Sequence, residues 1–367
     1  MAVTRKLVST RVLKEGMRID QSIVDGTGRA LIEKGAYLDD FQIEYLRTKG
    51  IASIYVAEGE VDPDELELQI PQYTRDLIAK AKVPDRPKAK LSESVKKQVC
   101  SGVQSLFANP NAENFTENSV GVATNLMNSV LADDAVAVDL GMLKVSDEYT
   151  FKHSVDVAAM SVVIGKNMGL PENELRDLSI SGLLHDVGKA KIPAEVLNKP
   201  GKLSDDEFAL MKQHTLFGFK ILKEKQSFSE PIMLGVLQHH EKCNGRGYPT
   251  KADASTIHKF ARIISVADVF DALVTKRPYK DPFSMYTATE MMMAMSDELD
   301  IDVLKVFLNT VILYPVDSIV TLSTGEVAKV VENTPGYPLR PKVVGLKQGI
   351  LYDLSNDKTY NNVVVIS

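Results

Sequence analysis

A stretch with helical periodicity runs from about residue 135 to residue 312, and it constrains the fold more than any other feature of this sequence. Apolar residues recur there every three to four positions, and capping patterns such as Ser204-Asp205-Asp206-Glu207 mark where single helices begin. Within it, residues 147–168 are expected to form one amphipathic helix. Segments that alternate between apolar and polar residues lie on both sides of the stretch. We therefore expect a mainly α protein: a helical bundle with a small N-terminal α+β domain and a C-terminal β appendage.

The same changes of pattern divide the 367 residues into four parts. Residues 1–65 combine alternating segments with one helical segment, which predicts an N-terminal α+β accessory domain. Residues 66–134 contain a linker rich in proline and charge, followed by connecting helices. Residues 135–312 are the main helical domain, and residues 313–367 are the β appendage, with a hairpin signal at Ser323-Thr324-Gly325.

Composition argues against several classes of protein. The formal net charge of −6 disfavours binding to a nucleic acid polymer, which needs a broad basic face. No run of about 18 apolar residues occurs, so we expect no membrane span. The sequence has only two cysteines, Cys100 and Cys243, which favours a reducing compartment and predicts a cytoplasmic protein.

The histidines are the most informative residues, because only six occur and five of them fall on predicted helices next to other ligand-type residues. Imidazole and carboxylate groups suit first-row divalent metal ions, and a carboxylate can bridge two of them. An ionised Asp186 directly after His185, on an apolar helix, needs a metal ion or another partner. Each histidine alone is more often a core or surface residue, but the whole set favours one metal cluster between helices. In chain order the set is His153, His185, Asp186, His214, His239, His240 and Asp268.

This ordered set resembles the HD superfamily of metal-dependent phosphohydrolases. The segment His239-His240-Glu241-Lys242-Cys243-Asn244-Gly245-Arg246-Gly247-Tyr248-Pro249 is similar to the HHExxDGxGYP signature of the HD-GYP subfamily, and Arg277-Pro278-Tyr279-Lys280 also resembles that subfamily. The resemblance covers roughly residues 140–335, and the N-terminal part is similar to a module often found ahead of HD-GYP domains. It implies an HD-type helical bundle and a phosphodiesterase that hydrolyses cyclic di-GMP to pGpG, GMP or both.

Carried onto this sequence, the resemblance implies that the seven residues of this set are metal ligands. It also implies that Asp186 bridges two ions. The family implies divalent ions, commonly iron or manganese. We expect two ions, because the glutamate that trinuclear members supply one turn before the first histidine is Tyr149 here. Lys189, one turn after His185, would face the scissile phosphate, so Asp186 and Lys189 are the expected catalytic residues. Water held between the ions would attack phosphorus without any protein nucleophile.

Substrate contacts and partners also follow from the resemblance. Arg277 and Lys280 match positions expected to contact the phosphates or guanine of the ligand. Lys189 is also expected to contact a phosphate of the substrate. Tyr248 would line the pocket or a surface for a protein partner, for which a diguanylate cyclase (GGDEF) domain is one candidate. Assembly into a homodimer is left open.

Three residues near the motifs depart from the ligand pattern. Asn244 stands where the signature has an aspartate, so the metal site is expected to be kept while the geometry of the loop, or its contact with a partner, can differ. His258 fits no ligand position, and we expect it on the surface or at a helix cap. Cys243 is expected to be a loop thiol without a catalytic role.

Two other functions stay open at this point. The protein could be a cyclic di-GMP receptor with weak turnover, although the complete ligand set and Lys189 argue against this. It could instead hydrolyse another cyclic dinucleotide such as cyclic GMP-AMP, because the metal ligands are shared across such reactions and only pocket residues would differ.

Overall fold

The structure is a computed structural model. It describes residues 4–58 with short gaps at 11–12, 15, 21–22, 25–29, 33–35, 50 and 52, and then residues 70–139, 151–275, 282–356 and 358–366. The chain divides into two compact units, Met1–Ile70 and Pro71–Ser367.

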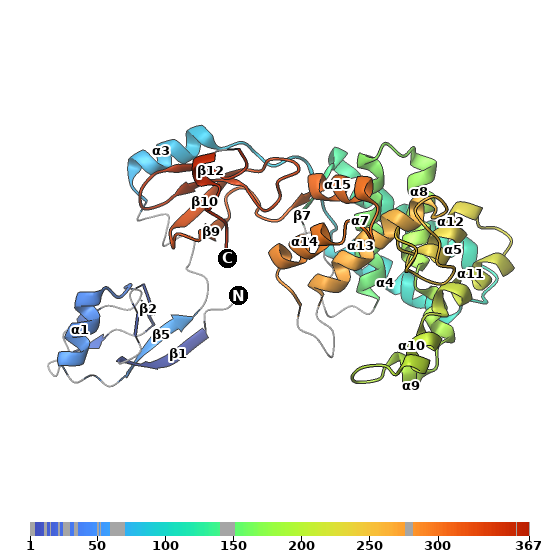
Figure 1. Cartoon of the computed structure of the whole chain (residues 1–367), viewed down its shortest axis with the longest axis horizontal. Helices are drawn as coiled ribbons and strands as arrows, with labels where there is room; N and C mark the ends of the chain where they lie inside the picture. The colour runs from blue at the N-terminus through green and yellow to red at the C-terminus, as the bar shows by residue number, and fades with distance from the viewer. Residues whose placement is uncertain are drawn as a thin grey trace. The chain divides into compact units, whose positions relative to one another are not determined.

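The first unit combines short strands with one helix (Figure 1). An antiparallel sheet has the order β1 (Thr4–Ser9), β5 (Ser53–Glu58), β2 (Arg18–Ile19), and β3 (Ile23–Val24) pairs separately with β4 (Ala30–Ile32). α1 (Asp40–Thr48) begins at a capping box, in which the Asp39 carboxylate accepts from the backbone N–H of Gln42 and the Gln42 side chain accepts from that of Asp39. Ile19 and Leu46 are fully buried in the small core. This is the α+β fold that the sequence predicts.

Helices dominate the second unit (Figure 1), and the mainly α fold class is confirmed. The largest buried side chains include Phe115, Phe260, Phe270 and Phe307, which lie in one continuous core. The helices are α4 (Glu93–Ala108), α5 (Phe115–Val130), α7 (Lys152–Asn167), α8 (Glu172–Leu184), α9 (Ala194–Leu197), α10 (Asp205–Met211), α11 (His214–Glu224), α12 (Glu230–Gln238), α13 (Lys259–Val274), α14 (Met285–Ala294) and α15 (Ile301–Thr310), with a 3₁₀ turn η3 (Val187–Lys191) after α8.

The helix α7 is the centre of this bundle, and it contacts α4, α5, α8, α13 and α15. Every residue from Ser154 to Gly165 is buried. The amphipathic pattern expected over residues 147–168 is therefore wrong for the described part of this helix, because neighbouring helices cover it all round. α8 approaches α7 closely at Gly182, where a Cβ atom would lie only 2.9 Å from the Ala158 Cα atom. This close packing fixes α7 and α8 against each other, and these helices carry the first predicted ligands, His153 and the His185-Asp186 pair.

The C-terminal strands form an antiparallel sheet in the order β12 (Leu351–Asp353), β11 (Lys342–Gly345), β10 (Val327–Glu332), β9 (Ile319–Thr321). β9 and β10 pair around Gly325, whose positive φ of 85° suits the predicted hairpin turn. α3 (Gln72–Ala81), from the segment expected to be a linker, contacts β10 and β11 of this sheet. Near the C-terminal end of this part, Val365 forms an isolated bridge with Leu322.

Three short strands join parts of the second unit that are distant in sequence. β6 (Lys88–Ala89), β7 (Ala137–Asp139) and β8 (Val311–Ile312) form a parallel sheet, so the segments just before and just after the helical bundle lie side by side. Among the described residues, no helix has the length and apolar character that crossing a membrane requires.

Candidate metal centre

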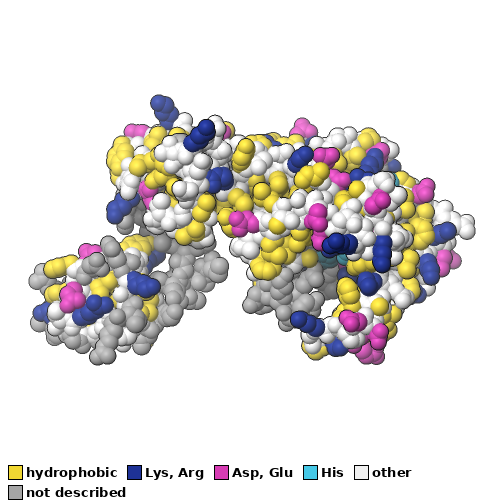
Figure 2. All heavy atoms as spheres, viewed as in Figure 1, with side chains coloured by type: hydrophobic (Ala, Val, Ile, Leu, Met, Phe, Trp, Pro, Cys, Tyr) yellow, Lys and Arg dark blue, Asp and Glu magenta, His cyan; other side chains and the backbone are white. Residues whose placement is uncertain are grey.

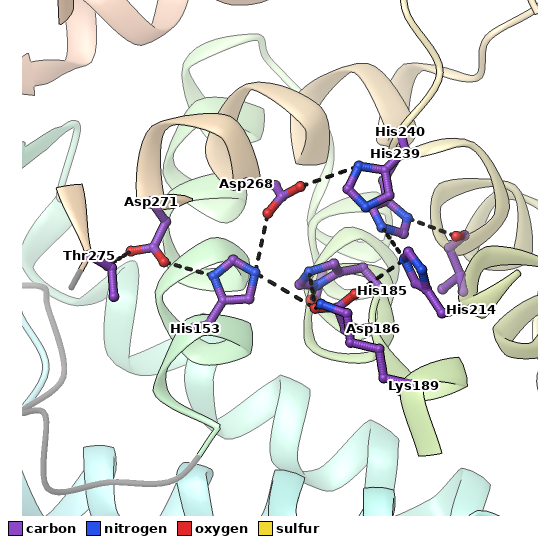
Figure 3. A network of polar contacts seen from close by, with 12 residues as sticks. His153, His185, Asp186, Lys189, His214, His239, His240, Asp268, Asp271 and Thr275 are labelled. Carbon is purple, nitrogen blue, oxygen red and sulfur yellow. Dashed lines mark hydrogen bonds and ion pairs between the residues drawn. The ribbon is translucent and has the colours of Figure 1, made fainter. Parts of the chain in front are cut away.

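The seven predicted ligands converge on one cluster, although they come from five helices (Figure 3). Four of the five positions are helix ends. His153 lies in the first turn of α7 and His214 begins α11, whereas the His185-Asp186 and His239-His240 pairs follow the last residues of α8 and α12. Only Asp268 lies inside a helix, α13. Helix ends leave room between them, so side chains from several elements can reach one point.

Asp186 is common to two groups of ligand atoms. One group is Asp186, His214, His239 and His240, the other is His153, His185 and Asp186, and within each group the ligand atoms lie within 4.8 Å of one another. The Asp186 Oδ1 atom is 3.4 Å from His214 Nε2, and its Oδ2 atom is 3.4 Å from His185 Nε2. The two carboxylate oxygens therefore face different groups, which is the geometry of a carboxylate that bridges two ions.

Three of the histidines are oriented by the same hydrogen bond. The Nδ1 atoms of His185, His214 and His239 lie 2.7, 2.8 and 2.8 Å from the carbonyl oxygens of the residues three positions earlier. A neutral imidazole that donates from Nδ1 carries its lone pair on Nε2. All three Nε2 atoms point into the cluster, so the backbone of each helix end fixes a tautomer suited to binding metal.

Asp271, which the sequence analysis did not predict, orients the fourth histidine. Its Oδ2 atom lies 2.7 Å from His153 Nδ1, and its Oδ1 atom accepts a hydrogen bond from Thr275 at 3.0 Å. Asp271 is fully buried on α13, one turn after Asp268, which lies 3.2 Å from His153 Nε2. The sequence signal was a second aspartate on the same apolar helix, and a carboxylate behind a ligand histidine is a common support of metal sites.

The donor atoms fit divalent metal ions. Among the described residues, the buried atoms His185 Nε2 and Asp186 Oδ1 have no hydrogen-bond partner. The His214 and His239 Nε2 atoms, both lone-pair bearing in the tautomers above, face each other at 3.4 Å. Unpartnered buried acceptors and opposed lone pairs are costly, and a cation between them removes both costs. This cluster of histidine and aspartate can thus hold divalent metal ions.

Burial and charge determine which of these groups are protonated. Burial lowers the pKa of His239 far below its ordinary value, lowers the pKa of His240 to about 3, and also lowers the pKa of His214. For His153, burial acts in the same direction, but hydrogen bonds to Asp268 and Asp271 prevail and raise its pKa to about 10. Burial alone would raise the pKa of Asp186, yet Lys189 and His185 hold it well below its usual range.

Lys189 lies beside the bridging carboxylate. Its Nζ atom is 2.5 Å from Asp186 Oδ2, and its side chain is 34% exposed, so the ammonium group is also accessible from solvent. Gly188 holds this segment in place, because a Cβ atom there would lie 1.9 Å from the backbone oxygen of His214. The absence of a side chain lets η3 lie directly on α11, which keeps Asp186 and His214 together.

The loop after His240 is fixed by a buried carboxylate. Glu241 accepts hydrogen bonds from the Thr250 backbone and hydroxyl at 2.6 and 2.7 Å and from the Ala252 backbone at 3.0 Å. Tyr248 is thereby placed against the cluster, with its ring centroid 4.7 Å from that of His240. The motif glutamate is thus a structural anchor of the loop.

The remaining predicted positions have varied outcomes. Arg277, Lys280 and Tyr149 lie outside the described residues. His258 caps α13 by accepting from the Phe260 backbone N–H, which confirms its expected cap role. Asn244 donates to Asp297 Oδ2 at 3.1 Å and accepts from the Arg246 backbone N–H at 3.1 Å.

Comparisons with known proteins agree with this site. Residues 140–303 match the family described as the HD domain. Cyclic di-GMP phosphodiesterase PA4108 of Pseudomonas aeruginosa is 35% identical over 228 residues, which are 62% of this chain and 55% of that protein. A cyclic di-GMP phosphodiesterase of Thermotoga maritima is 39% identical over 168 residues, 44% of this chain and 45% of that protein. The 3′3′-cGAMP-specific phosphodiesterase 2 of Vibrio cholerae is 42% identical over 127 residues, 34% of this chain and 24% of that protein.

Among solved structures, Bd1817, an HDG"Y"P protein from Bdellovibrio bacteriovorus, has a TM-score of 0.50 at 17% identity, covering 83% of this chain and 98% of that chain. At this identity the match supports the fold alone. The chain spans about half the length, or less, of the curated relatives named above. Residues 140–303 are an HD domain. Within this stretch, the two histidines after α12 and the GYP loop that follows them resemble the HD-GYP signature.

We predict that Gly188→Ala displaces η3 from α11, because the new Cβ atom would overlap the His214 carbonyl. Such overpacking is expected to cost about 1–3 kcal/mol of unfolding free energy, and the shift of Asp186 is expected to weaken metal binding at least about 10-fold. Urea denaturation and metal titration measure the two effects. Gly121→Ala on α5 is the matched control, since nothing lies within 4 Å of its Cβ position. A Gly188→Ala protein equal to the unsubstituted protein in both assays would refute this packing role.

Metal binding at pH 7 is expected to release about one proton, because His153, with its pKa raised to about 10, is charged before metal binds while His240 is already neutral. The raised pKa means that the charged His153 stabilises the metal-free fold at low pH and that this contribution is lost as pH rises through about 10. Metal affinity should accordingly increase with pH up to that value. Calorimetric titrations in buffers of different ionisation enthalpy measure the released proton. His153→Asn should lower the release by about one proton, and a release equal to that of the unsubstituted protein would contradict the assignment.

Asn244→Asp is expected to destabilise the loop, because a second carboxylate would then face Asp297 in place of the amide donor. Both groups are solvent-accessible, so the effect should be small, and it should shrink at high salt concentration. Thermal denaturation at low and high salt tests this. Asp297→Asn in the same chain should restore the midpoint, whereas a reduced metal content would show that Asn244 acts on the ligands instead.

Proposed function

We propose that this chain hydrolyses cyclic di-GMP with metal-activated water, and the observation that carries the proposal is the pair of ligand groups that share Asp186. Two divalent ions in such a site bind phosphate oxygens and lower the pKa of a bound water. The seven residues His153, His185, Asp186, His214, His239, His240 and Asp268 would hold them. Five imidazoles with carboxylates, and no thiolate, suit iron or manganese.

Lys189 is the residue proposed to act on the substrate itself. Its ammonium group lies against Asp186 and is partly exposed, so it can move from that carboxylate to a phosphoryl oxygen. A positive charge at that point stabilises the negative charge that develops when phosphorus is attacked. Histidine atoms reach the surface of the helical part beside basic side chains (Figure 2), which supports the approach of an anionic substrate.

Tyr248 is proposed to line the substrate site on the side of His240. The ring centroids of Phe208 and Tyr248 are 6.5 Å apart, and Phe208 is 49% exposed. The Lys212 Nζ atom lies 5.1 Å from the centroid of the Phe208 ring. This exposed aromatic and cationic cluster suits either a base of the substrate or a protein partner, such as a diguanylate cyclase (GGDEF) domain. Contacts from Arg277 and Lys280, a homodimer and a cytoplasmic location remain predictions from the sequence.

A second candidate is hydrolysis of 3′3′-cGAMP, and the Vibrio cholerae relative whose name states that specificity favours it. The metal ligands would serve both reactions, since both substrates contain the same phosphodiester linkage. The difference would lie in the residues that contact the bases.

The proposal is tested with purified protein loaded anaerobically with iron or manganese. We expect cyclic di-GMP to be converted to pGpG or GMP, and Asp186→Ala to reduce the rate at least about 100-fold, because loss of the shared ligand exceeds the loss of an outer support. Chromatography of the products measures the rate. Asp206→Ala, an exposed aspartate at the start of α10, is the matched control and should keep full activity.

Three outcomes separate the alternatives. A fully metallated protein that binds cyclic di-GMP without cleaving it would replace the enzyme by a receptor. Faster cleavage of 3′3′-cGAMP than of cyclic di-GMP would favour the second candidate. Activity that survives in Asp186→Ala would remove the metal cluster from the reaction.

A further inference from the structure

An apolar pocket of about 460 Å³ opens beside the proposed metal cluster, and Tyr248 is not among its described lining residues. At one end it is lined by His153, Asp186 and Lys189, which the proposed function already uses. Its other described walls are mostly carbon: Gln104, Phe107 and Ala108 of α4, Phe151 and Ser154 near the start of α7, Ala190 of η3 and Leu197 of α9. Pockets of this size commonly bind small organic ligands.

The walls include a pair of aromatic rings. Phe107 and Phe151 lie 5.0 Å apart between centroids, with an angle of 60° between the rings. Leu197 adds a further apolar side chain to the lining and is 40% exposed. Gln104 is exposed at the same pocket and adds an amide that can both donate and accept hydrogen bonds.

Phe151 adopts a backbone conformation that disfavours its own residue type. Its φ of 64° and ψ of 16° lie in the left-handed region, where a bulky side chain is strained. Asparagine or glycine would fit this position without strain, and the contacts of the Phe151 ring with Phe107 and the bundle core compensate for the strain. Its position two residues before His153 places that ring at the edge of the metal cluster.

We propose that this pocket binds one nucleobase of the substrate, and this inference rests on the proposed function. A nucleotide whose phosphate lies at the Asp186 and Lys189 end would direct its base toward the apolar end. The flat faces of a purine stack on aromatic and aliphatic side chains, and its polar edge can bond to an amide such as that of Gln104. α4 then belongs to the substrate site rather than to a connecting segment.

The test compares the affinities of manganese-loaded protein for guanosine 5′-monophosphate and for ribose 5-phosphate, which differ only in the base. We expect the nucleotide to bind about 5- to 100-fold more tightly, as stacking of one base on aromatic rings provides. Ala108→Trp fills the pocket from an exposed position, and it should abolish the difference while the metal content is unchanged. Lys97→Trp, also exposed on α4 but outside the pocket, is the matched control.

Phe151→Asn separates a binding role from a merely structural one. This substitution relieves the strained φ but also removes a ring that packs against the core, so the thermal midpoint is expected to fall. The readout that a merely structural role would not move is the preference for the nucleotide, which should fall about 5-fold or more. Affinity for ribose 5-phosphate should stay constant in both variants.

The inference is overturned if the protein binds the two ligands equally or binds neither, or if the preference survives in Ala108→Trp. These outcomes are distinct from failure of the proposed function. A protein that shows the base preference, and loses it in Ala108→Trp, but does not cleave cyclic di-GMP would keep the pocket and lose the phosphodiesterase.

Discussion

The buried carboxylate of Asp186 is the constraint on which the rest of this site depends. Its side chain is only 7% exposed, yet its pKa is held well below the usual range, so it remains an anion inside the bundle. Lys189 compensates one oxygen at 2.5 Å, and the other has no hydrogen-bond partner among the described residues. A buried anion with a free oxygen requires more positive charge than one lysine supplies. Divalent ions at the surrounding imidazoles would provide it.

The bundle meets this requirement by bringing helix ends together. The rings of His185, His214 and His239 are each oriented by a hydrogen bond to the backbone carbonyl three residues earlier. The backbone conformation of the helix end therefore determines the orientation of each ring. The glycines at the closest approaches, Gly182 against α7 and Gly188 against α11, bring those ends near enough for their ligands to share Asp186. Packing and chemistry are therefore coupled through backbone positions where no side chain fits.

The gathering of these side chains in one cluster could be predicted from the sequence because metal chemistry restricts residue types. Histidines are rare in this chain, and an Asp186 or Asp268 among apolar neighbours is informative without coordinates. Asp271 was missed because a buried carboxylate behind a histidine looks like any other helix residue until the ring it touches is known. The all-round burial of α7 was missed because a sequence pattern shows how apolar a helix is, not how many neighbours cover it. The pocket beside Phe107 and Phe151 joins segments 44 residues apart, a proximity that only the fold creates.

The two kinds of wall around this site differ in how firmly they are fixed. The proposed metal ligands lie on or directly after α7, α8, α11, α12 and α13, which pack against one another in the bundle. Apart from those near the start of α7, the proposed base-binding residues come from α4, η3 and the short α9, and several of them, such as Gln104 and Leu197, are exposed. Exposed positions tolerate substitution far better than core positions. A fixed centre for the phosphodiester, with exchangeable walls for the bases, is consistent with the similarity of this chain both to relatives named for cyclic di-GMP and to one named for 3′3′-cGAMP.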